Sequence, residues 1–186
     1  EILVKSPCMF KGYYKDPEGT AAVLKDGWFH SGDSGLIRED GHLVFTDRLK
    51  DLVELPGGHK VAPQSIESRL RSSPHIKDAW ILAGPEGAYL AAIIVINYDN
   101  VSRWAGKNRV AFTSFAELSQ APEVYELVRQ DIDRVNQTVP AGARVKKYIN
   151  LHKELDPDEG ELTRTRNLKK SFLAERYRKV VDAMYS

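Results

Sequence analysis

Two short polar segments hold the residues that are best suited to bind a nucleotide. Asp33 lies among glycines in the run Gly-Asp-Ser-Gly, and an aspartate carboxylate can accept hydrogen bonds from both hydroxyls of a ribose. Asp47, Arg48 and Lys50 follow within the run Asp-Arg-Leu-Lys-Asp. Arg48 can fork onto ribose or phosphate oxygens, whereas Lys50 acts as a point charge. Each segment also has a plain structural interpretation, as a turn or as a solvated charged loop.

Two further segments could handle a thiol or a phosphate. Gly57 and Gly58 precede His59, and a glycine pair either lets a slender ligand pass close to the backbone or simply turns the chain. Residues 161–170 form a polar, basic stretch that ends in two lysines and precedes a predicted helix. Its hydroxyls and cations suit a phosphate-bearing partner, and the alternative is a charged entry to the helix.

Several catalytic and binding motifs are missing from the sequence. The five histidines and Cys8 show no metal-ligand spacing, so we predict no metal site in this chain. The sequence has no nucleophile elbow of a serine hydrolase, and it has no Gly-Lys-Ser or Gly-Lys-Thr phosphate loop. An enzyme that uses ATP would therefore need its phosphate-binding loop outside these 186 residues.

The composition is that of a globular protein. Apolar residues make up 42% of the chain and charged residues 28%, which is enough apolar surface to bury a core. The net charge of +1 gives no electrostatic argument for nucleic acid, so we expect none as a partner. No run of 18 apolar residues is present, so we expect no membrane-spanning helix. The single Cys8 excludes an internal disulfide and fits a reducing, cytoplasmic location.

The elements that must position these residues divide the chain. Residues 1–46 contain short strands and a hairpin turn at Asp40 and Gly41, and they are too few to stand alone. Residues 53–186 mix helices with a small sheet, which predicts an α+β fold, and residues 47–52 form a candidate hinge. Strands are expected at 2–4, 35–37, 43–45, 52–55, 79–82, 89–96 and 147–151, and helices at 16–24 and from Pro63, Ser114, Pro122 and about Ser171. Because the chain opens in a strand without an initiator methionine, we expect a piece of a longer protein.

Together these segments resemble the carboxyl end of the acyl-CoA synthetases, a family of adenylate-forming enzymes. The resemblance covers nearly the whole chain and depends on several motifs that occur in the family's order. These motifs are residues 1–7, 12–14, 26–33, 40–43, 47–52, 62–63 and 66–67. Residues 112–118, the Leu162-Thr163-x-Thr165 motif and residues 176–179 are most similar to the long-chain fatty acyl-CoA synthetases, including the bubblegum type. An extra segment at about residues 97–138, which short-chain relatives usually lack, points the same way.

The resemblance implies a fold and a reaction. Residues 53–186 would be the mobile carboxyl-terminal domain, a small mixed sheet flanked by helices, and residues 1–46 the β-rich end of the large amino-terminal domain. Such enzymes join a fatty acid to ATP, which gives an acyl-adenylate and pyrophosphate. The carboxyl-terminal domain then rotates, and the thiol of coenzyme A attacks the adenylate. Mg²⁺ would arrive with ATP, and AMP would be released.

The resemblance also implies a role for each candidate residue. Asp33 would hold the ribose with support from Arg48, Lys50 would approach the phosphate, Asp47 would be the hinge, and Gly57, Gly58 and His59 would border the coenzyme A tunnel. Lys169 falls where the family places the lysine of the adenylation step, and it would neutralise charge on the carboxylate and the α-phosphate. Many relatives have glycine before that lysine, whereas this chain has Leu168, so Lys170 is a rival. At the position of His59 the family more often has an acid or another polar residue.

These implications lead to a main hypothesis and two alternatives. The chain alone is expected to be inactive, because the phosphate-binding loop and the fatty-acid pocket would lie upstream. One alternative is an adenylation domain that loads an acyl-carrier protein. The other is a non-enzymatic binding or assembly module, in which the charged loops are only solvated surface. Peripheral contact with a membrane and the oligomeric state stay open at this level.

Overall fold

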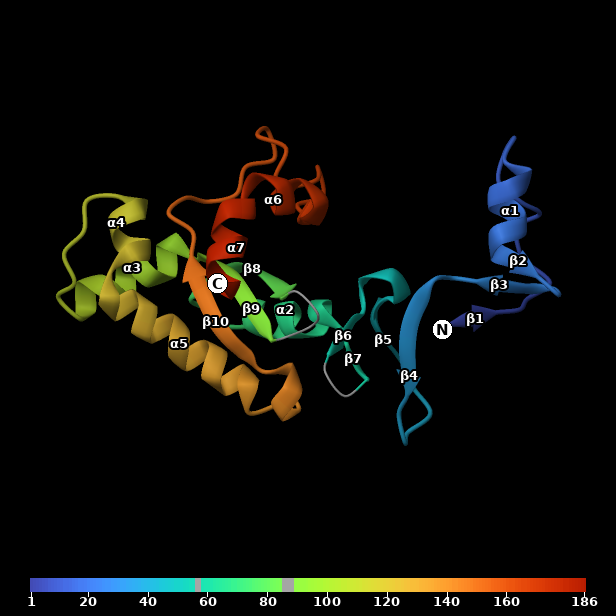
Figure 1. Cartoon of the computed structure of the whole chain (residues 1–186), viewed down its shortest axis with the longest axis horizontal. Coiled ribbons are helices and arrows are strands. Elements are labelled where there is room, and N and C mark those ends of the chain that lie inside the picture. Colours follow the sequence, from blue (N-terminus) through green and yellow to red (C-terminus); the bar gives the residue numbers. More distant parts are fainter. Residues whose placement is uncertain (56–57, 85–88) are drawn as a thin grey trace. The chain divides into compact units, whose positions relative to one another are not determined.

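The computed structural model describes residues 1–55, 58–84 and 89–186 (Figure 1). These residues form two compact units, the first unit (Glu1–Leu52) and the second unit (Val53–Ser186). The prediction of an α+β fold with small sheets and flanking helices is confirmed.

The first unit is built from short strands and one short helix. It contains β1 (Leu3–Val4), α1 (Pro17–Val23), β2 (Leu24–Lys25), β3 (Trp28–His30), β4 (Asp33–Ile37), β5 (Leu43–Arg48) and the 3₁₀ turn η1 (Leu49–Asp51). Strand β3 pairs antiparallel with β1 and β2, and β4 pairs antiparallel with β5. The predicted hairpin turn is confirmed, since Gly41 has a φ of +82° and donates its N–H to the carbonyl of Arg38.

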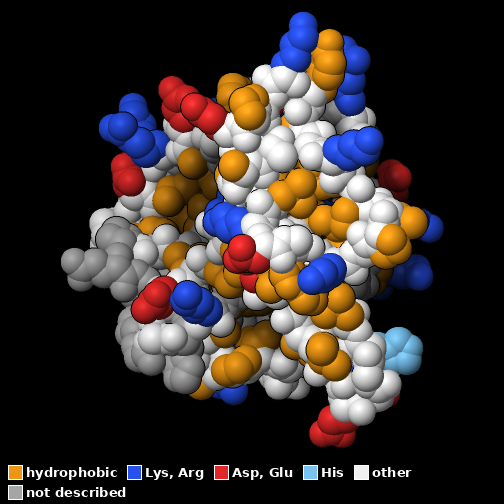
Figure 2. Space-filling model, turned by 90° about the vertical axis from the view of Figure 1, so that its right-hand side faces the viewer, with side chains coloured by type: hydrophobic (Ala, Val, Ile, Leu, Met, Phe, Trp, Pro, Cys, Tyr) orange, Lys and Arg blue, Asp and Glu red, His pale blue; other side chains and the backbone are white. Residues whose placement is uncertain are grey.

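The first unit buries little of its apolar surface. All of its residues are described, and Asp47 is the only one that is fully buried. Many of its large hydrophobic side chains are exposed, including Phe10, Tyr13, Tyr14, Trp28, Leu36, Ile37, Leu43 and Phe45. Figure 2 accordingly shows hydrophobic side chains scattered over the surface between charged ones. A unit with so little buried hydrophobic surface has little hydrophobic stabilisation of its own.

The second unit has three layers. It contains β6 (Val53–Leu55), β7 (His59–Val61), α2 (Pro63–Arg71), β8 (Ile76–Ala83), β9 (Leu90–Ile96), α3 (Tyr98–Lys107), α4 (Phe115–Gln120), α5 (Pro122–Asn136), η3 (Ala141–Ala143), β10 (Val145–Asn150), α6 (Lys170–Arg176) and α7 (Arg178–Tyr185). The central sheet has the order β10-β9-β8, with β8 antiparallel and β10 parallel to β9, so the predicted small mixed sheet is confirmed. Helices α2–α5 cover one face, whereas α6 and α7, red in Figure 1, cover the other.

Strand β9 explains why the sequence has a continuous apolar run at 89–96. The side chains of Leu90, Ala92, Ile94 and Ile96 pack into the core beneath α2–α5, and those of Ala91, Ile93 and Val95 pack beneath α6 and α7. All seven residues of the strand are buried. A strand that is covered on both faces needs apolar residues at every position rather than at every second one.

Most helices begin where the sequence predicts, with two differences. Ser114 accepts a hydrogen bond from the Glu117 N–H at the start of α4, as the capping-box pattern predicts. Helix α3 is not predicted, because it buries only Val101 and Ala105 and its apolar pattern is too short to read. The expected last helix is two helices, α6 and α7, because the backbone leaves the helical conformation at Tyr177.

Candidate functional site

The first unit brings Asp33 and Arg48 together. These residues face each other across the β4–β5 hairpin, near an irregularity of the register between Ser34 and Gly35. The Arg48 guanidinium donates from Nη1 to Oδ1 of Asp33 at 2.6 Å. The Asp33 side chain is 27% exposed and that of Arg48 is 50% exposed, so the pair lies at the surface. The second carboxylate oxygen of Asp33 has no hydrogen-bond donor among the described residues, so it can accept from ligand hydroxyls.

Backbone contacts fix the turn that presents Asp33. Gly32 has a φ of +71°, which a residue with a side chain rarely adopts, and its carbonyl accepts the N–H of Leu49 at 2.8 Å. The carboxylate of Glu1 accepts the Gly32 N–H at 3.0 Å and also contacts Nδ1 of His30 at 2.9 Å. The hydrogen bonds from His30 and Gly32 hold the pKa of Glu1 below its usual value. Contacts with Leu49 and Glu1 therefore fix the backbone of the residue that precedes Asp33.

Only part of the charged run at residues 47–51 lies in a turn. Asp47 and Arg48 are the last two residues of β5, and Lys50 lies in the 3₁₀ turn that follows. Asp47 is 1% exposed, and its Oδ1 accepts the N–H of Arg48 at 2.8 Å. Lys50 is exposed. Asp47 and Arg48 belong to the strand because they pair with Ser34 and Asp33 of β4.

The Gly57-Gly58-His59 segment is only partly described. Gly57 lies outside the described residues, as does the side chain of His59. Gly58 has a φ of +77° and donates its N–H to the Leu55 carbonyl at 3.1 Å, which makes a tight turn between β6 and β7. The backbone of His59 begins β7 and pairs with Leu55. A side chain added at Gly58 would meet no atom within 4 Å, so glycine is needed there for its backbone conformation rather than for space.

Residues 161–169, the lysine loop, form a short closed hairpin that ends at Lys169. Leu162 and Leu168 form an antiparallel bridge, and the Lys169 N–H donates to the Glu161 carbonyl at 3.0 Å. Inside this closure, the Thr163 N–H donates to the Asn167 carbonyl at 2.8 Å. Both ends of the loop are thus tied to each other by backbone hydrogen bonds, which limits the positions that the lysine backbone can take.

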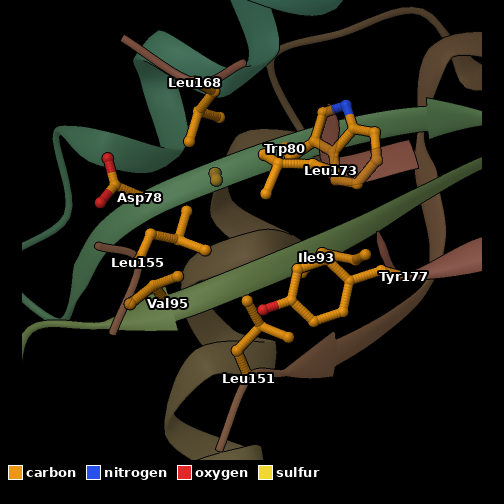
Figure 3. Close-up of a pocket in the computed structure, with 10 residues that line it drawn as sticks. Asp78, Trp80, Ile93, Val95, Leu151, Leu155, Leu168, Leu173 and Tyr177 are labelled. Carbon is orange, nitrogen blue, oxygen red and sulfur yellow. The ribbon is translucent and has the colours of Figure 1, made fainter. Parts of the chain in front are cut away.

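Apolar packing seats this loop on the sheet (Figure 3). Leu168 packs on the face of the sheet to which Trp80 and Val95 contribute. Leu173 of α6 and Tyr177 at the α6–α7 junction pack on the same face. The cavity left between them is only about 10 Å³, close to the space of one water molecule. The packing therefore leaves no room for a ligand there, and the space serves to support the loop.

The two candidate lysines have different surroundings. Lys169 is exposed, and its ammonium has no hydrogen bond or ion pair with any other described residue. Lys170 instead lies with its Nζ 3.0 Å from Oε1 of Glu67, whose side chain is 5% exposed. The same Glu67 oxygen accepts the N–H of Ile81 at 3.0 Å, at the outer edge of β8. Lys170 therefore ties the start of α6 to α2 and β8, whereas the exposed ammonium of Lys169 has no such partner among the described residues.

Comparisons with known proteins identify the family of this chain. The family model for the AMP-binding enzyme C-terminal domain matches residues 50–186. The chain belongs to the AMP-binding enzyme family. It is 30% identical to the long-chain-fatty-acid–CoA ligase FadD15 of Mycobacterium tuberculosis and 35% identical to long chain acyl-CoA synthetase 1 of Arabidopsis thaliana. Both alignments include 100% of this chain but only 31% and 28% of those proteins, so the chain spans less than a third of their length.

A solved adenylation domain shares the fold of this AMP-binding C-terminal domain. The adenylation domain of a carboxylate reductase from Mycobacterium chelonae superposes with a TM-score of 0.77 at 26% identity. The match covers 98% of this chain and 27% of that one. Within the described residues, no helix has the length and apolar composition needed to cross a membrane.

Sequence reasoning missed the buried carboxylates of this AMP-binding domain. Glu67 and Glu161 are both buried, and each receives a cation from another part of the chain. Glu161 directly precedes the Leu162-Thr163 motif, where an acidic segment (residues 154–160) meets a basic one (residues 164–170), and this position is the signal that could have indicated it. Glu67 follows Ile66 on the buried face of α2, and only its place among apolar neighbours distinguishes it from a surface glutamate.

Proposed function

We propose that this chain is the carboxyl-terminal part of an ATP-dependent long-chain fatty acid–CoA ligase. In this proposal the first unit ends the large nucleotide-binding domain, residues 47–52 include the hinge, and the second unit is the mobile domain. The relatives named above support the substrate class, since both carry long-chain acyl-CoA ligase or synthetase names. The observation that carries the proposal is the free ammonium of Lys169 at the end of a closed, well-seated loop.

Asp33 and Arg48 would bind the ribose of ATP. Arg48 already holds one oxygen of the Asp33 carboxylate, so the other is oriented to accept from the two ribose hydroxyls. The guanidinium has further donors for a ribose or phosphate oxygen. Because the turn at Gly32 is fixed by backbone hydrogen bonds, binding the ribose would cost little additional ordering.

Lys169 would act in the adenylation step. As a fatty carboxylate attacks the α-phosphorus of ATP, negative charge builds on the non-bridging oxygens while pyrophosphate leaves. An ammonium placed near these oxygens stabilises that charge more than it stabilises the separate reactants, which lowers the barrier. An exposed lysine without a competing carboxylate can supply this charge, whereas Lys170 is already engaged by Glu67.

The remaining residues complete the proposal. Asp47 would be the pivot at the end of β5, Lys50 would approach a phosphate, and Gly57, Gly58 and His59 would border the path of coenzyme A. The open space beside Gly58 supports that role, because an added side chain would meet no atom within 4 Å. Mg²⁺ would enter as the counter-ion of the ATP phosphates. Rotation of the mobile domain would then move the lysine loop away from the acyl-adenylate and bring the coenzyme A path to it.

An adenylation domain that loads a carrier protein is the second candidate. The similarity to a carboxylate reductase adenylation domain supports keeping it, because that likeness covers nearly the whole chain. The full-length enzyme would be offered free coenzyme A and, separately, a phosphopantetheinyl carrier protein as acceptors. Thioester formed with free coenzyme A supports the ligase, and transfer only to the carrier supports this alternative.

The test of the lysine assignment replaces Lys169 by alanine in the full-length enzyme. We expect the rate of acyl-adenylate formation, measured by pyrophosphate exchange, to fall about 10²–10³-fold. Thioester formation from a supplied acyl-adenylate should change only a few-fold. Lys179→Ala is the matched control, since Lys179 is an exposed lysine of α7. Adenylation at the normal rate by Lys169→Ala would refute the assignment.

A further inference from the structure

A buried carboxylate lies where the lysine loop begins. The Glu161 side chain is 0% exposed, and three groups donate to it. The Tyr177 hydroxyl donates to Oε1 at 2.8 Å, and the Asp156 N–H and the Lys153 ammonium donate to Oε2 at 2.9 and 3.1 Å. Nε of Arg176 lies 3.3 Å from Oε1. Glu161 thus joins the segment after β10 to the end of α6.

The charges of this cluster are well matched. Glu159 also bonds both Lys153 and Arg176, so these two cations and the two carboxylates of Glu159 and Glu161 form a closed network. Burial raises the pKa of the Glu161 carboxyl, but the hydrogen bonds from Asp156, Tyr177 and Lys153 outweigh it and hold that pKa below its usual value. Burial and the bond to Glu161 raise the pKa of Tyr177, so its hydroxyl keeps its proton and remains a donor. Glu161 is accordingly a charged acceptor at neutral pH.

The backbone of Glu161 connects this network to Lys169. Its carbonyl accepts the Lys169 N–H at 3.0 Å, and its N–H donates to the Asp156 carbonyl at 3.2 Å. The Lys169 carbonyl in turn accepts the N–H of Leu173 in the first turn of α6. A shift of the Glu161 backbone would therefore move the backbone of Lys169 directly.

We propose that Glu161 is the positioning residue that fixes where Lys169 presents its ammonium. This inference rests on the role proposed above for Lys169, because Glu161 itself is buried and cannot touch a substrate. The four partners of Glu161 restrict the conformations of the lysine loop before the substrate binds. The adenylation step therefore does not include the entropy cost of ordering the loop. The need for accurate placement explains why a carboxylate is buried at a site where an apolar side chain would fill the same space.

A second buried carboxylate in the same unit provides the control. Asp131 of α5 has a side chain that is 0% exposed, and it contacts Ser73, His75 and Arg134. Its chemistry matches that of Glu161, with hydroxyl and cationic donors around one carboxylate. It packs on the opposite face of the sheet, under α2–α5, and makes no contact with the lysine loop. Asp131→Asn therefore reports what the loss of a buried charge does to the unit as a whole.

The first experiment measures amide hydrogen exchange in this chain. Glu161→Gln keeps the volume but replaces an acceptor oxygen by a donor group that faces Lys153, Arg176 or Tyr177. We expect the Lys169 amide to exchange about tenfold faster in this variant, whereas amides of β9 such as Ile94 change little. Asp131→Asn should leave the Lys169 amide at its normal rate relative to β9. Unchanged protection of Lys169 in Glu161→Gln would overturn the proposal without any reference to catalysis.

The second experiment separates the two half-reactions in the full-length enzyme. For Glu161→Gln we expect adenylation to fall about 10–100-fold, with thioester formation from supplied acyl-adenylate within about threefold of normal. Asp131→Asn should leave the ratio of the two rates unchanged. Equal losses in both half-reactions, or the same pattern in Asp131→Asn, would show a role in stability only and would refute positioning.

A milder variant covers the case in which Glu161→Gln does not fold. Tyr177→Phe removes one hydroxyl donor and keeps the ring in its apolar seat. The same two measurements should then show about threefold effects in the same direction, and no effect in either would count against the proposal. If the normal enzyme forms no acyl-adenylate at all, the proposed function fails, while the exchange experiment still decides whether Glu161 holds Lys169.

Discussion

The two neighbouring lysines should respond to alanine substitution in opposite ways. Lys170→Ala removes the ammonium that lies 3.0 Å from Oε1 of Glu67, and the Glu67 side chain is only 5% exposed. Among the described residues, that carboxylate then keeps the hydrogen bond from the N–H of Ile81. Lys169→Ala removes a charge that has no partner among the described residues. Stability should therefore report on Lys170, and adenylation on Lys169.

The expected magnitude follows from the burial of the two partners. Removing one partner of a fully buried ion pair costs about 3–5 kcal/mol, because the other charge is left uncompensated. The Lys170 side chain is 37% exposed, so water can approach once it is removed. We therefore expect a loss of about 2–3 kcal/mol, which lowers the melting temperature of the second unit by roughly 5–15 °C. For Lys169→Ala the change should stay within about 0.5 kcal/mol.

The assay is thermal and urea unfolding of the chain, followed by tryptophan fluorescence. Trp80 and Trp104 both lie in the second unit, and Trp80 is buried on the sheet. Glu67→Gln and the double variant with Lys170→Ala complete a thermodynamic cycle. Because the two groups are in contact, we expect a coupling free energy of about 1–3 kcal/mol.

One pattern of results would refute this reasoning. If Lys170→Ala unfolds at the normal temperature, shows no coupling to Glu67 and loses adenylation about a hundredfold, then Lys170 is the catalytic lysine. Loss of adenylation by Lys170→Ala together with lower stability, at a temperature where the variant stays folded, would instead indicate that it positions its neighbour.

Two further predictions concern the core and acid stability. Ile94 in β9 is 0% exposed, so Ile94→Ala should lower the free energy of unfolding in urea by about 3 kcal/mol. Ile37 is 75% exposed, so Ile37→Ala should lower it by less than about 0.5 kcal/mol. Similar losses at both sites would contradict the assigned core. Because the folded pKa of Glu161 is lowered, its stabilising contribution is complete above its unfolded pKa of about 4.3 and is lost as the pH falls through the folded value. The unfolding free energy should therefore decline more steeply between about pH 5 and pH 3 in the normal chain than in Glu161→Gln, and parallel slopes would contradict this.

Local patterns predict much of the fold. The apolar run at 89–96 identifies a doubly covered strand, and Pro63, Ser114 and Pro122 mark helix starts because each acts through its own few neighbours. Helix α3 escapes prediction because it buries only two apolar residues. The break at Tyr177 escapes as well, since the hydroxyl of that residue is engaged by Glu161, which precedes the helix in the sequence.

The candidate site is less predictable than the fold. The Gly-Asp-Ser-Gly run and the following Asp-Arg pair indicate residues for a nucleotide, but their contact depends on the irregular register of β4 and β5. The sequence also cannot distinguish Lys169 from Lys170, because the difference arises from Glu67 in a distant helix. Buried charges depend on partners that only the folded chain assembles, and a glutamate in a charged segment resembles surface until then.

The carboxylate of Glu67 has a consequence for the behaviour of the chain in concentrated solution. Strand β8 is the outermost strand of its sheet, and an open strand edge is a template on which another molecule can add a strand. At Ile81 that edge is already occupied, because the side chain of Glu67 takes the outward N–H. A foreign strand that paired there would have to displace the buried Glu67 carboxylate from the N–H of Ile81, so this contact blocks strand addition at that position of the edge.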